Sequence, residues 1–336
     1  MKNIVITGGG TGGHLSIAKA IKEELNKRGI KPIFIGSSSG QDAQWFKDDE
    51  GFEACYFLDI SSVVDKKYFG KLISLFRIFI KTIKCRNIFK IHDIDRVFSV
   101  GGYGAAPASF ASILFGKRFF IHEQNAVFGK LHKILSKKAE IVFSSYFESS
   151  PVKNYPVREE FFKDARVRQE IKTIIFLGGS QGASAINEFA MSVSVILKQK
   201  GIKIIHQCGE KDEKRVRDFY EKNQIKVDLF SFSPNLHKKI KDADFAICRA
   251  GAGTLWELCA AKIPALYIPY PYAAKDHQFF NANFLVKRGF SFVKRQRDLK
   301  IDDLEMIFSC DLKMMSEGLG KLIEPNGAKS IVDCLI

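Results

Sequence analysis

Residues 3–14 read NIVITGGGTGGH, and this stretch decides how the chain around it folds. The β-branched run Asn3–Thr7 predicts a strand, which stops at the glycine cluster Gly8–Gly13, and an apolar pattern at helical spacing follows from Leu15. Glycines leave no Cβ between backbone N–H groups and an anion, and the N-terminus of a helix adds partial positive charge. The stretch therefore predicts a phosphate cradle with a titratable side chain, His14, at its mouth.

The same glycines also match the dinucleotide fingerprint G-x-G-x-x-G. That fingerprint requires an acidic residue about 20 positions further on to bind a ribose. The next predicted strand, 32–35, runs into Gly36-Ser37-Ser38-Ser39 without an Asp or Glu at its end. A nicotinamide site therefore ranks below phosphate binding of another kind, and a tight turn without a ligand remains the alternative.

Length and charge narrow the class of protein. The chain has 336 residues, which favours two domains, each with its own core. Its 52 Lys and Arg against 37 Asp and Glu give a net charge of +15, which implies an anionic partner: nucleic acid, an anionic membrane surface or a phosphorylated substrate. No helix-turn-helix, zinc-finger, RNP or KH pattern occurs, so nucleic acid ranks low.

The cysteines and the apolar stretches indicate the compartment. The 7 cysteines are scattered and contain no C-x-x-C pair, which favours reduced core residues in a cytosolic protein. The sequence enters a strand at once, without the basic and apolar regions of a signal peptide, and no run of about 18 uncharged apolar residues occurs. We expect a protein that is neither secreted nor membrane-spanning.

Strand and helix patterns alternate twice along the chain. In the first half, strands are predicted at 3–7, 31–35, 53–58, 96–100, 118–122 and 140–144, with helices between them, the longest within 66–91. Residues 151–158 contain two prolines and form the expected linker, after which strands recur at 174–177, 202–207, 226–230, 245–248 and 264–268. This alternation predicts an α/β fold of two Rossmann-like, doubly wound parallel-sheet domains facing each other across a cleft, 1–157 and 158–321. The last segment, about 322–336, could pack back on the first domain.

Two further strand ends in the first half carry polar or glycine-rich loops. The strand 96–100 opens into Gly101-Gly102-Tyr103-Gly104, and the strand 118–122 ends in His122-Glu123-Gln124-Asn125. The carboxyl ends of parallel strands meet at one edge of a sheet, where ligands bind. These loops therefore belong to the same predicted site as Gly8–His14.

The segment 66–84 combines basic and aromatic residues on a predicted helix. Leu72, Phe76, Phe79 and Ile83 share one face, Ile73 and Ile80 widen it, and Lys67, Lys71, Lys81 and Lys84 surround it. Such a helix is typical of one that lies on an anionic membrane surface. A buried helix with solvated lysines is the equally weighted alternative.

The second half offers a sugar-nucleotide site. Residues 248–257 follow a strand, contain small residues and end in Glu257, which we expect in the first turn of a helix, where it could accept hydrogen bonds from both hydroxyls of a ribose. Complementing the helix dipole is the alternative role. Gln278 and Asn281 lie one turn apart on the next helix and could bind sugar hydroxyls or simply cap that helix.

Taken together, six motifs make the chain similar to a known family. They are GGGTGGH (8–14), GGYGAA (101–106), HEQN (122–125), GGSQGA (178–183), RAGAGTLWE (249–257) and His277-Gln278 with Asn281. In order and spacing, from residue 3 to about 290, they resemble the MurG family, the lipid I N-acetylglucosaminyltransferases of bacterial peptidoglycan synthesis. The resemblance implies a GT-B fold and a peripheral enzyme on the cytoplasmic face of the inner membrane.

The substrates and partners follow from the same resemblance. It implies UDP-N-acetylglucosamine as donor, undecaprenyl-linked lipid I as acceptor, the anionic inner leaflet and cell-wall synthesis proteins as partners, and neither cofactor nor metal. The Asp93-Ile94-Asp95 triplet looks like a metal-binding DxD motif, but it precedes a strand, on the edge away from the site. Another lipid glycosyltransferase, of the diacylglycerol type, and a nicotinamide- or flavin-binding module are the alternative functions.

The resemblance also implies roles for individual residues. His14 is the expected general base of an inverting transfer, with Glu123 as the second candidate. The residues expected to bind the donor are Thr11, Gly12, Gly13, Asn125, Arg158, Ser180, Ser233, Ala252, Gly253, Thr254, Leu255, Trp256, Glu257, Gln278 and Asn281. Those expected at the acceptor diphosphate are Gly10, Gly12, Gly13, Gly102, Tyr103 and Gly104. Those expected at the membrane are Leu72, Ile73, Phe76, Phe79, Ile80, Lys71, Lys81 and Lys84. Ala273-Ala274 look like an insertion relative to the family.

Overall fold

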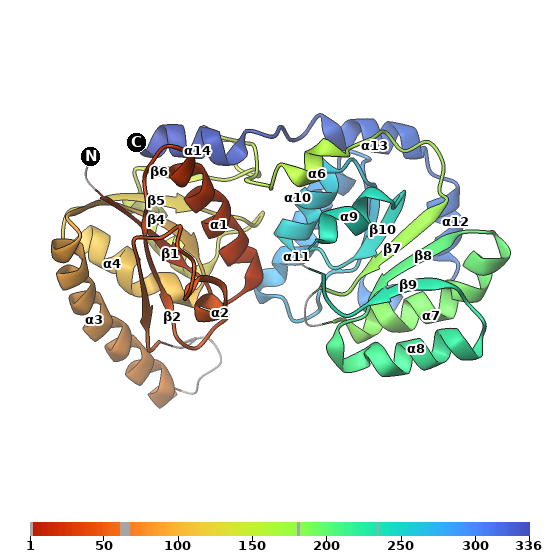
Figure 1. The fold of residues 1–336 in the computed structure, drawn as a ribbon, viewed down its shortest axis with the longest axis horizontal. Helices are drawn as coiled ribbons and strands as arrows, with labels where there is room; N and C mark the ends of the chain where they lie inside the picture. The colour runs from red at the N-terminus through yellow and green to blue at the C-terminus, as the bar shows by residue number, and fades with distance from the viewer. Residues whose placement is uncertain (1–2, 61–67, 180–181, 234) are drawn as a thin grey trace. The chain divides into compact units, whose positions relative to one another are not determined.

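The chain folds into two compact units in a computed structural model. Residues 3–60, 68–179, 182–233 and 235–336 are described, the side chains of 68–72 excepted. One unit comprises Met1–Pro156 with Asn326–Ile336, and the other comprises Val157–Pro325 (Figure 1). Each contains a six-stranded, fully parallel sheet. The predicted pair of doubly wound α/β domains is therefore confirmed.

The first unit has the strand order β3-β2-β1-β4-β5-β6. The order reverses between β1 and β4, so the loops after these two strands meet at the position where such sheets bind ligands. Its strands are β1 (Asn3–Gly8), β2 (Ile33–Ser37), β3 (Ala54–Leu58), β4 (Ile94–Gly101), β5 (Arg118–His122) and β6 (Ile141–Phe143), and its helices are α1 (Gly12–Lys27), α2 (Asp42–Phe46), α3 (Tyr68–Ile91), α4 (Ala106–Leu114), α5 (Lys130–Leu135) and α14 (Gly327–Leu335).

The second unit repeats this plan with the order β12-β11-β10-β7-β8-β9, which reverses between β7 and β10. Its strands are β7 (Thr173–Leu177), β8 (Lys203–Gln207), β9 (Val227–Phe230), β10 (Phe245–Cys248), β11 (Ala265–Tyr267) and β12 (Phe292–Val293). Its helices are α6 (Glu160–Lys163), α7 (Ser184–Gln199), α8 (Glu213–Lys222), α9 (Leu236–Lys241), α10 (Ala252–Ala260), α11 (His277–Val286), α12 (Asp303–Phe308) and α13 (Leu312–Gly320).

Each sheet is covered by its own hydrophobic core. The central strands β1, β2, β7 and β10 are almost entirely buried, as expected where helices cover both faces of a parallel sheet, whereas the edge strands β3, β9 and β12 are only partly buried. Val5, Ile33 and Val97 pack in the first core, and Ile174, Phe176 and Ile247 in the second. The cysteines are all free thiols, and burial raises the pKa of Cys85 to about 12, so this thiol is an unreactive core residue.

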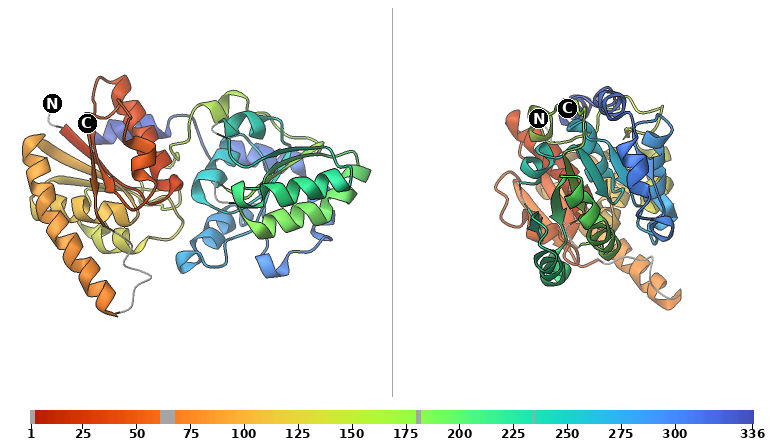
Figure 2. Two further views of the ribbon diagram at one scale, coloured as in Figure 1. Left: turned by 60° about the horizontal axis from the view of Figure 1, so that its bottom comes forward. Right: turned by 90° about the vertical axis from the view of Figure 1, so that its right-hand side faces the viewer.

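Helix α3 packs on the first sheet through only part of its surface. Cys85, Ile88 and Phe89 of its C-terminal half enter the core. Further toward its N-terminus, Ser74 and Thr82 are buried, while Leu75, Phe76, Phe79 and Ile80 between them face solvent. This half of α3 extends beyond the strands (Figures 1 and 2). Within the described part of the chain we find no helix with the length and apolar content that crossing a bilayer requires.

The C-terminal helix α14 belongs to the first unit. Ile331, Val332 and Leu335 are buried, and α14 packs against α1 (Figure 1). Arg28 at the end of α1 forms an ion pair with Asp333 at 2.7 Å. The sequence alone left open whether this last segment packs on the first domain, and the structure places it on α1.

Candidate functional site

The two glycine loops of the first unit pack directly on each other. The Gly9 N–H donates to the Gly101 carbonyl at 3.1 Å. Gly8, Gly9 and Gly10 all have positive φ, and a Cβ on Gly102 would stand 2.0 Å from the Gly9 carbonyl oxygen. These glycines are therefore explained by close backbone packing at the switch point between β1 and β4.

A buried carboxylate that the sequence analysis missed supports this packing. Asp42, at the start of α2, is fully buried and accepts from the Gly10 N–H at 2.6 Å and the Ser37 N–H at 2.7 Å. Burial raises the pKa of Asp42, against the effect of these two hydrogen bonds. Since Asp42 already occupies the Gly10 N–H, that amide is not available to the acceptor diphosphate as predicted. The sequence does contain this Asp five residues after the end of β2, but it lies further past the strand than the acidic residue of the ribose-binding pattern.

The N-terminus of α1 is the part of the first loop that packing does not explain. A Cβ on Gly12 or Gly13 would meet its nearest protein atoms at 3.6 Å, an ordinary contact. One of these atoms is the Gln124 Oε1, which is buried and has no hydrogen-bond partner within the described residues. Glycine at 12 and 13 thus leaves room for a bound group, which the helix N-terminus favours if it is anionic and to which Gln124 offers an acceptor.

His14 stands in the first turn of α1. Its Nδ1 lies 2.8 Å from the Oγ1 of the exposed Thr11. Its Nε2 lies 3.3 Å from the point where a Cβ of Gly101 would stand, so the ring faces the second glycine loop. Tyr103, on the same loop, packs over Gly10, and burial raises its pKa. The structure thus brings His14, Thr11 and both loops together.

Glu123 does not offer its carboxylate to a ligand as the second candidate base. It is 2% exposed, and its oxygens accept from the His132 Nδ1, the Gly129 N–H and the Asn125 N–H at 3.0, 3.0 and 3.1 Å. Burial alone would raise the pKa of Glu123, but these hydrogen bonds hold it below its usual value. Glu123 therefore fixes the loop that carries Asn125, and the prediction that it acts as a base is wrong on physical grounds.

His122, the last residue of β5, is also buried. Burial lowers its pKa to about 3, and its Nδ1 has no hydrogen-bond partner among the described residues. Its ring lies edge-to-face against Tyr155 at 5.5 Å. His122 is therefore a neutral core residue beneath the loop.

The second unit has a pocket of about 480 Å³ at the switch point of its sheet. It lies where β7, β10 and β11 end, and Arg249 places its guanidinium over the Tyr270 ring at 5.6 Å within it. Burial lowers the pKa of Arg249. The lining residues are Gly178, Gly182, Ala183, Ser184, Ala185, Lys211, Arg249, Tyr270, Pro271, Tyr272, Gln278 and Gln296.

Helix α10 begins earlier than predicted, and this changes the position of Glu257. The helix starts at Ala252, with Gly251 as its N-cap, so Glu257 stands in the second turn and the first turn carries no acidic residue. The predicted first-turn position is therefore wrong, because Ala252 and Gly253 are already helical. Burial raises the pKa of Glu257 to about 7, and the positive charge of Arg158 opposes this rise.

The other residues of α10 differ in how much space surrounds them. A Cβ on Gly251 or Gly253 would meet nothing within 4 Å, so open space surrounds the N-terminus of α10. Leu255 and Trp256 are buried, and Trp256 packs against Phe284. The helical period turns these two side chains into the core, so only the backbone groups of Leu255 and Trp256 could contact the donor. The side chain of Ala252 is likewise buried, while Thr254 is partly exposed.

Gln278 and Asn281 differ in their surroundings. Gln278 lines the pocket, and its Oε1 accepts from the Tyr270 N–H at 2.8 Å. Asn281 is fully buried and donates to the Ala250 carbonyl at 3.2 Å, so it holds the loop before α10. Between Tyr270 and Gln278, Lys275 and Asp276 both have φ of 55°, a conformation that non-glycine residues adopt only under constraint.

The remaining predicted residues occupy various positions. Arg158 packs over Phe161 at 5.4 Å, Ser233 accepts from the Asn235 N–H at 3.2 Å, and Ser180 lies outside the described residues.

On α3, Phe76, Phe79, Ile73 and Ile80 are 64%, 59%, 53% and 48% exposed. Lys84 is exposed and Lys81 partly so, whereas the side chains of Lys71 and Leu72 lie outside the described set. The exposed aromatic face contradicts the alternative of a buried helix.

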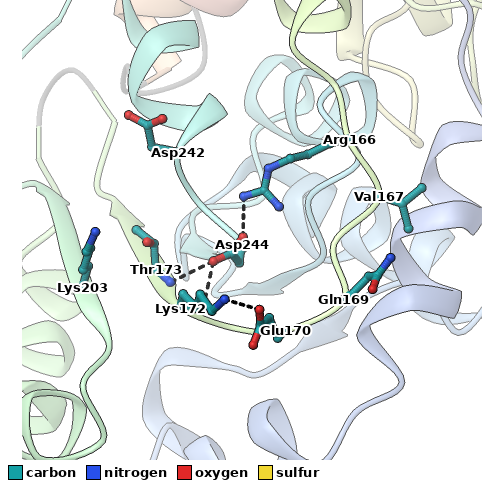
Figure 3. Close-up of a pocket in the computed structure, with 9 residues that line it drawn as sticks. All are labelled: Arg166, Val167, Gln169, Glu170, Lys172, Thr173, Lys203, Asp242 and Asp244. Atoms are coloured by element: carbon teal, nitrogen blue, oxygen red, sulfur yellow. Dashed lines mark hydrogen bonds and ion pairs between the residues drawn. The ribbon is translucent and has the colours of Figure 1, made fainter.

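A second pocket of the second unit lies at the opposite, amino edge of its sheet (Figure 3). There Asp244 accepts from Arg166 at 2.5 Å and from the Lys172 and Thr173 N–H groups at 2.9 Å each. Glu170 pairs with the ammonium of Lys172. Four of the charged residues of this pocket, Arg166, Glu170, Lys172 and Asp244, are thus paired with one another, and ligands of such sheets bind at the other edge.

Comparisons with known proteins agree with this geometry. Residues 4–144 match the N-terminal domain of glycosyltransferase family 28, and residues 173–316 match its C-terminal domain. The solved structure of Acinetobacter baumannii MurG is 28% identical, covers 99% of both chains and superposes with a TM-score of 0.81. The two parallel-sheet units are thus those of a GT-B glycosyltransferase, as predicted.

Curated relatives are closer in sequence. A protein of Campylobacter hominis is 51% identical over 99% of this chain and 97% of its own length, and one of Wolinella succinogenes is 46% identical over 99% of both. Both are named UDP-N-acetylglucosamine–N-acetylmuramyl-(pentapeptide) pyrophosphoryl-undecaprenol N-acetylglucosamine transferase. From the loops, the pocket and these matches together, the chain belongs to glycosyltransferase family 28 and, within it, to the MurG family of N-acetylglucosamine transferases.

Proposed function

We propose that this protein transfers N-acetylglucosamine from UDP-N-acetylglucosamine to the C4 hydroxyl of N-acetylmuramoyl-(pentapeptide)-diphospho-undecaprenol, lipid I, and so forms lipid II for peptidoglycan. The observation that carries the proposal is the 51% identity, over 99% of the chain, to a relative named for this transfer. A nicotinamide module fits poorly, because the acid nearest the first loop, Asp42, is buried and holds backbone N–H groups.

The donor would bind to the second unit. The open N-terminus of α10 suits a diphosphate, and Glu257 in the second turn suits the ribose hydroxyls. Gln278, on the pocket wall, offers its amide to the sugar. Arg249 and Lys211 line the same pocket and can stabilise the negative charge that develops on the departing UDP.

The acceptor would bind to the first unit. The N-terminus of α1, with Gly12 and Gly13, would face the lipid diphosphate, and the Gln124 oxygen would accept a hydrogen bond from the bound molecule. His14 would take the proton of the C4 hydroxyl while that oxygen forms its bond to the anomeric carbon. The bond from that carbon to the UDP oxygen breaks and UDP leaves with the electron pair, so the anomeric configuration inverts.

Helix α3 would hold the enzyme on the membrane that contains the acceptor. Its exposed Phe76 and Phe79 offer apolar surface, and neighbouring basic residues such as Lys84 offer charge to anionic lipids. The protein would then be peripheral, on the cytoplasmic face of the inner membrane, where other cell-wall synthesis proteins are partners to expect.

A transfer assay tests the proposal. The purified protein is given UDP-N-acetylglucosamine with either lipid I or diacylglycerol, and the glycosylated lipid is identified by mass spectrometry. We expect lipid II from lipid I and no product from diacylglycerol. Glycosylation of diacylglycerol alone would replace the proposal by the diacylglycerol function, and binding of NAD without binding of UDP would replace it by the nicotinamide one.

The His14→Ala variant tests the base. We expect turnover to fall by about 10²–10⁴, because general-base catalysis contributes on that order. UDP affinity, measured by calorimetry, should stay at the wild-type value, since Glu257 and Gln278, at which we propose that the donor binds, belong to the second unit. Unchanged turnover would remove His14 as the base.

A further inference from the structure

A buried histidine of the first unit, His132, contacts the glycine loop that His14 faces. His132 lies on α5 and is 3% exposed. Its Nδ1 donates to the Glu123 carboxylate at 3.0 Å, and its Nε2 lies 3.2 Å from the Ser99 hydroxyl of β4. Both ring nitrogens are thus bound to fixed groups, so the orientation of the ring is determined.

The ring edge between these two nitrogens touches Gly101. A Cβ on Gly101 would stand 2.9 Å from the His132 Cε1 and 3.3 Å from the His14 Nε2. The two histidines therefore approach the same peptide, one from α5 and the other from α1. The Gly101 carbonyl in turn accepts from the Gly9 N–H at 3.1 Å, which connects it to the loop that leads into His14.

We propose that His132 is a positioning residue: held by Glu123, it fixes the Gly101 peptide and thereby sets the orientation of the His14 imidazole toward the acceptor hydroxyl. The inference rests on the proposed function, in which His14 is the base. His132 itself is buried and does not touch the substrate. Its contribution follows from the geometry, because displacing a catalytic group by about 1 Å can cost on the order of 10²-fold in rate.

The alternative is that His132 merely stabilises the fold, and a double-mutant cycle with His14 separates the two roles. If His132 acts through His14, replacing it should matter only while His14 is present. If its role is structural, replacing His132 should lower kcat by the same factor in the wild-type and in the His14→Ala background.

The experiment measures kcat and KM for His14→Ala, His132→Ala, the double variant and the wild type, with UDP-N-acetylglucosamine and lipid I. We expect His132→Ala to lower kcat about 10-fold or more in the wild-type background and less than about 3-fold in the His14→Ala background. The KM for the donor should change less than about 2-fold, because Glu257 and Gln278, at which we propose that the donor binds, belong to the second unit.

A matched control exists in the same unit. His92 forms the same kind of pair with Glu53, at 3.0 Å from Nδ1, and its Nε2 also has a partner, the Tyr56 hydroxyl at 2.8 Å. It precedes β4, at the opposite end of the strand from Gly101. His92→Ala should therefore leave kcat unchanged, even if it lowers the melting temperature.

The possible outcomes separate the positioning role of His132 from the proposed transfer function on which it rests. Equal loss from His132→Ala in both backgrounds, or no loss in the wild-type background, would overturn the positioning role while leaving the transfer reaction intact. Absence of transfer by the wild type would overturn the proposed function itself. If His132→Ala does not fold, Glu123→Gln replaces it in the cycle, since it keeps the side-chain shape and weakens the hold on His132; additive losses there would equally overturn the proposal.

Discussion

At the scale of single residues, Asp42 shows how much of a glycine loop can be determined by one side chain. Its carboxylate joins the ends of two strands, β1 through Gly10 and β2 through Ser37. A Cβ on Gly9 or Gly36 would stand 2.2 or 2.6 Å from its Oδ2. Part of the glycine pattern therefore serves Asp42 rather than a ligand, which leaves Gly12 and Gly13 as the glycines with a binding role to test.

The Asp42→Asn variant tests this role. The amide keeps the shape of the carboxylate, but its NH₂ must face one of two backbone N–H groups, so one buried donor loses its partner. We expect a loss of about 1–3 kcal/mol in the free energy of unfolding by urea, together with lower turnover. Asp48→Asn, at an exposed position of the same segment, should change neither quantity. Equal stability of the two variants would contradict the role assigned to Asp42.

Glu257 predicts a dependence of stability on pH. Its pKa is raised by burial to about 7 in the folded chain, from 4.5 for a model carboxyl group. Between these two values the folded state binds more protons than the unfolded state, so the free energy of unfolding should fall as pH rises from 4.5 to 7 and then level off. In Glu257→Gln this contribution should be absent. Thermal melts of both proteins from pH 5 to 8 check it, and parallel curves would count against a raised pKa.

At the scale of elements, α3 is the clearest case of a helix whose two faces serve different purposes. Its inner face buries Cys85, Ile88 and Phe89 in the first core, and its outer face leaves Phe76 and Phe79 exposed. A monomeric protein rarely exposes so much contiguous apolar surface without a binding role.

A paired substitution on this helix tests membrane docking. Phe76→Asp with Phe79→Asp removes exposed apolar surface and adds negative charge, so sedimentation with anionic vesicles should weaken by at least about 10-fold. UDP affinity should stay unchanged. Val195→Asp, at an exposed apolar position on α7 of the second unit, is the control and should sediment like the wild type. Full retention of the double variant on vesicles would remove α3 as the docking element.

The elements also show what the sequence could and could not predict. The order of strands and helices along the chain followed from alternating patterns, because strands covered on both faces are continuously apolar, whereas the strand orders of the two sheets and their switch points come from the structure alone. The start of α10 was not predicted from the sequence, since Ala252-Gly253 has the composition of a loop but is helical. Glu123, Leu255 and Trp256 were assigned to the site on their position in a motif, but their side chains are buried. His132 could not be found, because its partners Glu123 and Ser99 come from other elements of the sheet.

At the scale of the whole molecule, the first unit is built from two separated parts of the chain. Its final helix, α14, buries Ile331, Val332 and Leu335 and pairs Asp333 with Arg28 of α1. Truncation after Pro325 should therefore destabilise the first unit by at least about 4 kcal/mol, from the burial of three aliphatic side chains. Urea unfolding should show an early transition, while UDP still binds to the second unit. Lys329→Ala, an exposed position on α14, is the control; an unchanged transition in the truncated chain would contradict the role of α14.

The position of α14 has a consequence for synthesis in the cell. The sheet of the first unit leaves the ribosome early, but the helix that covers α1 follows only after the whole of Val157–Pro325 has been translated. Until then the apolar surface beneath α14 stays uncovered during the many seconds that translation of the second unit takes, at about 5–20 residues per second. The nascent first unit is therefore the stage at which we expect chaperones to bind this protein.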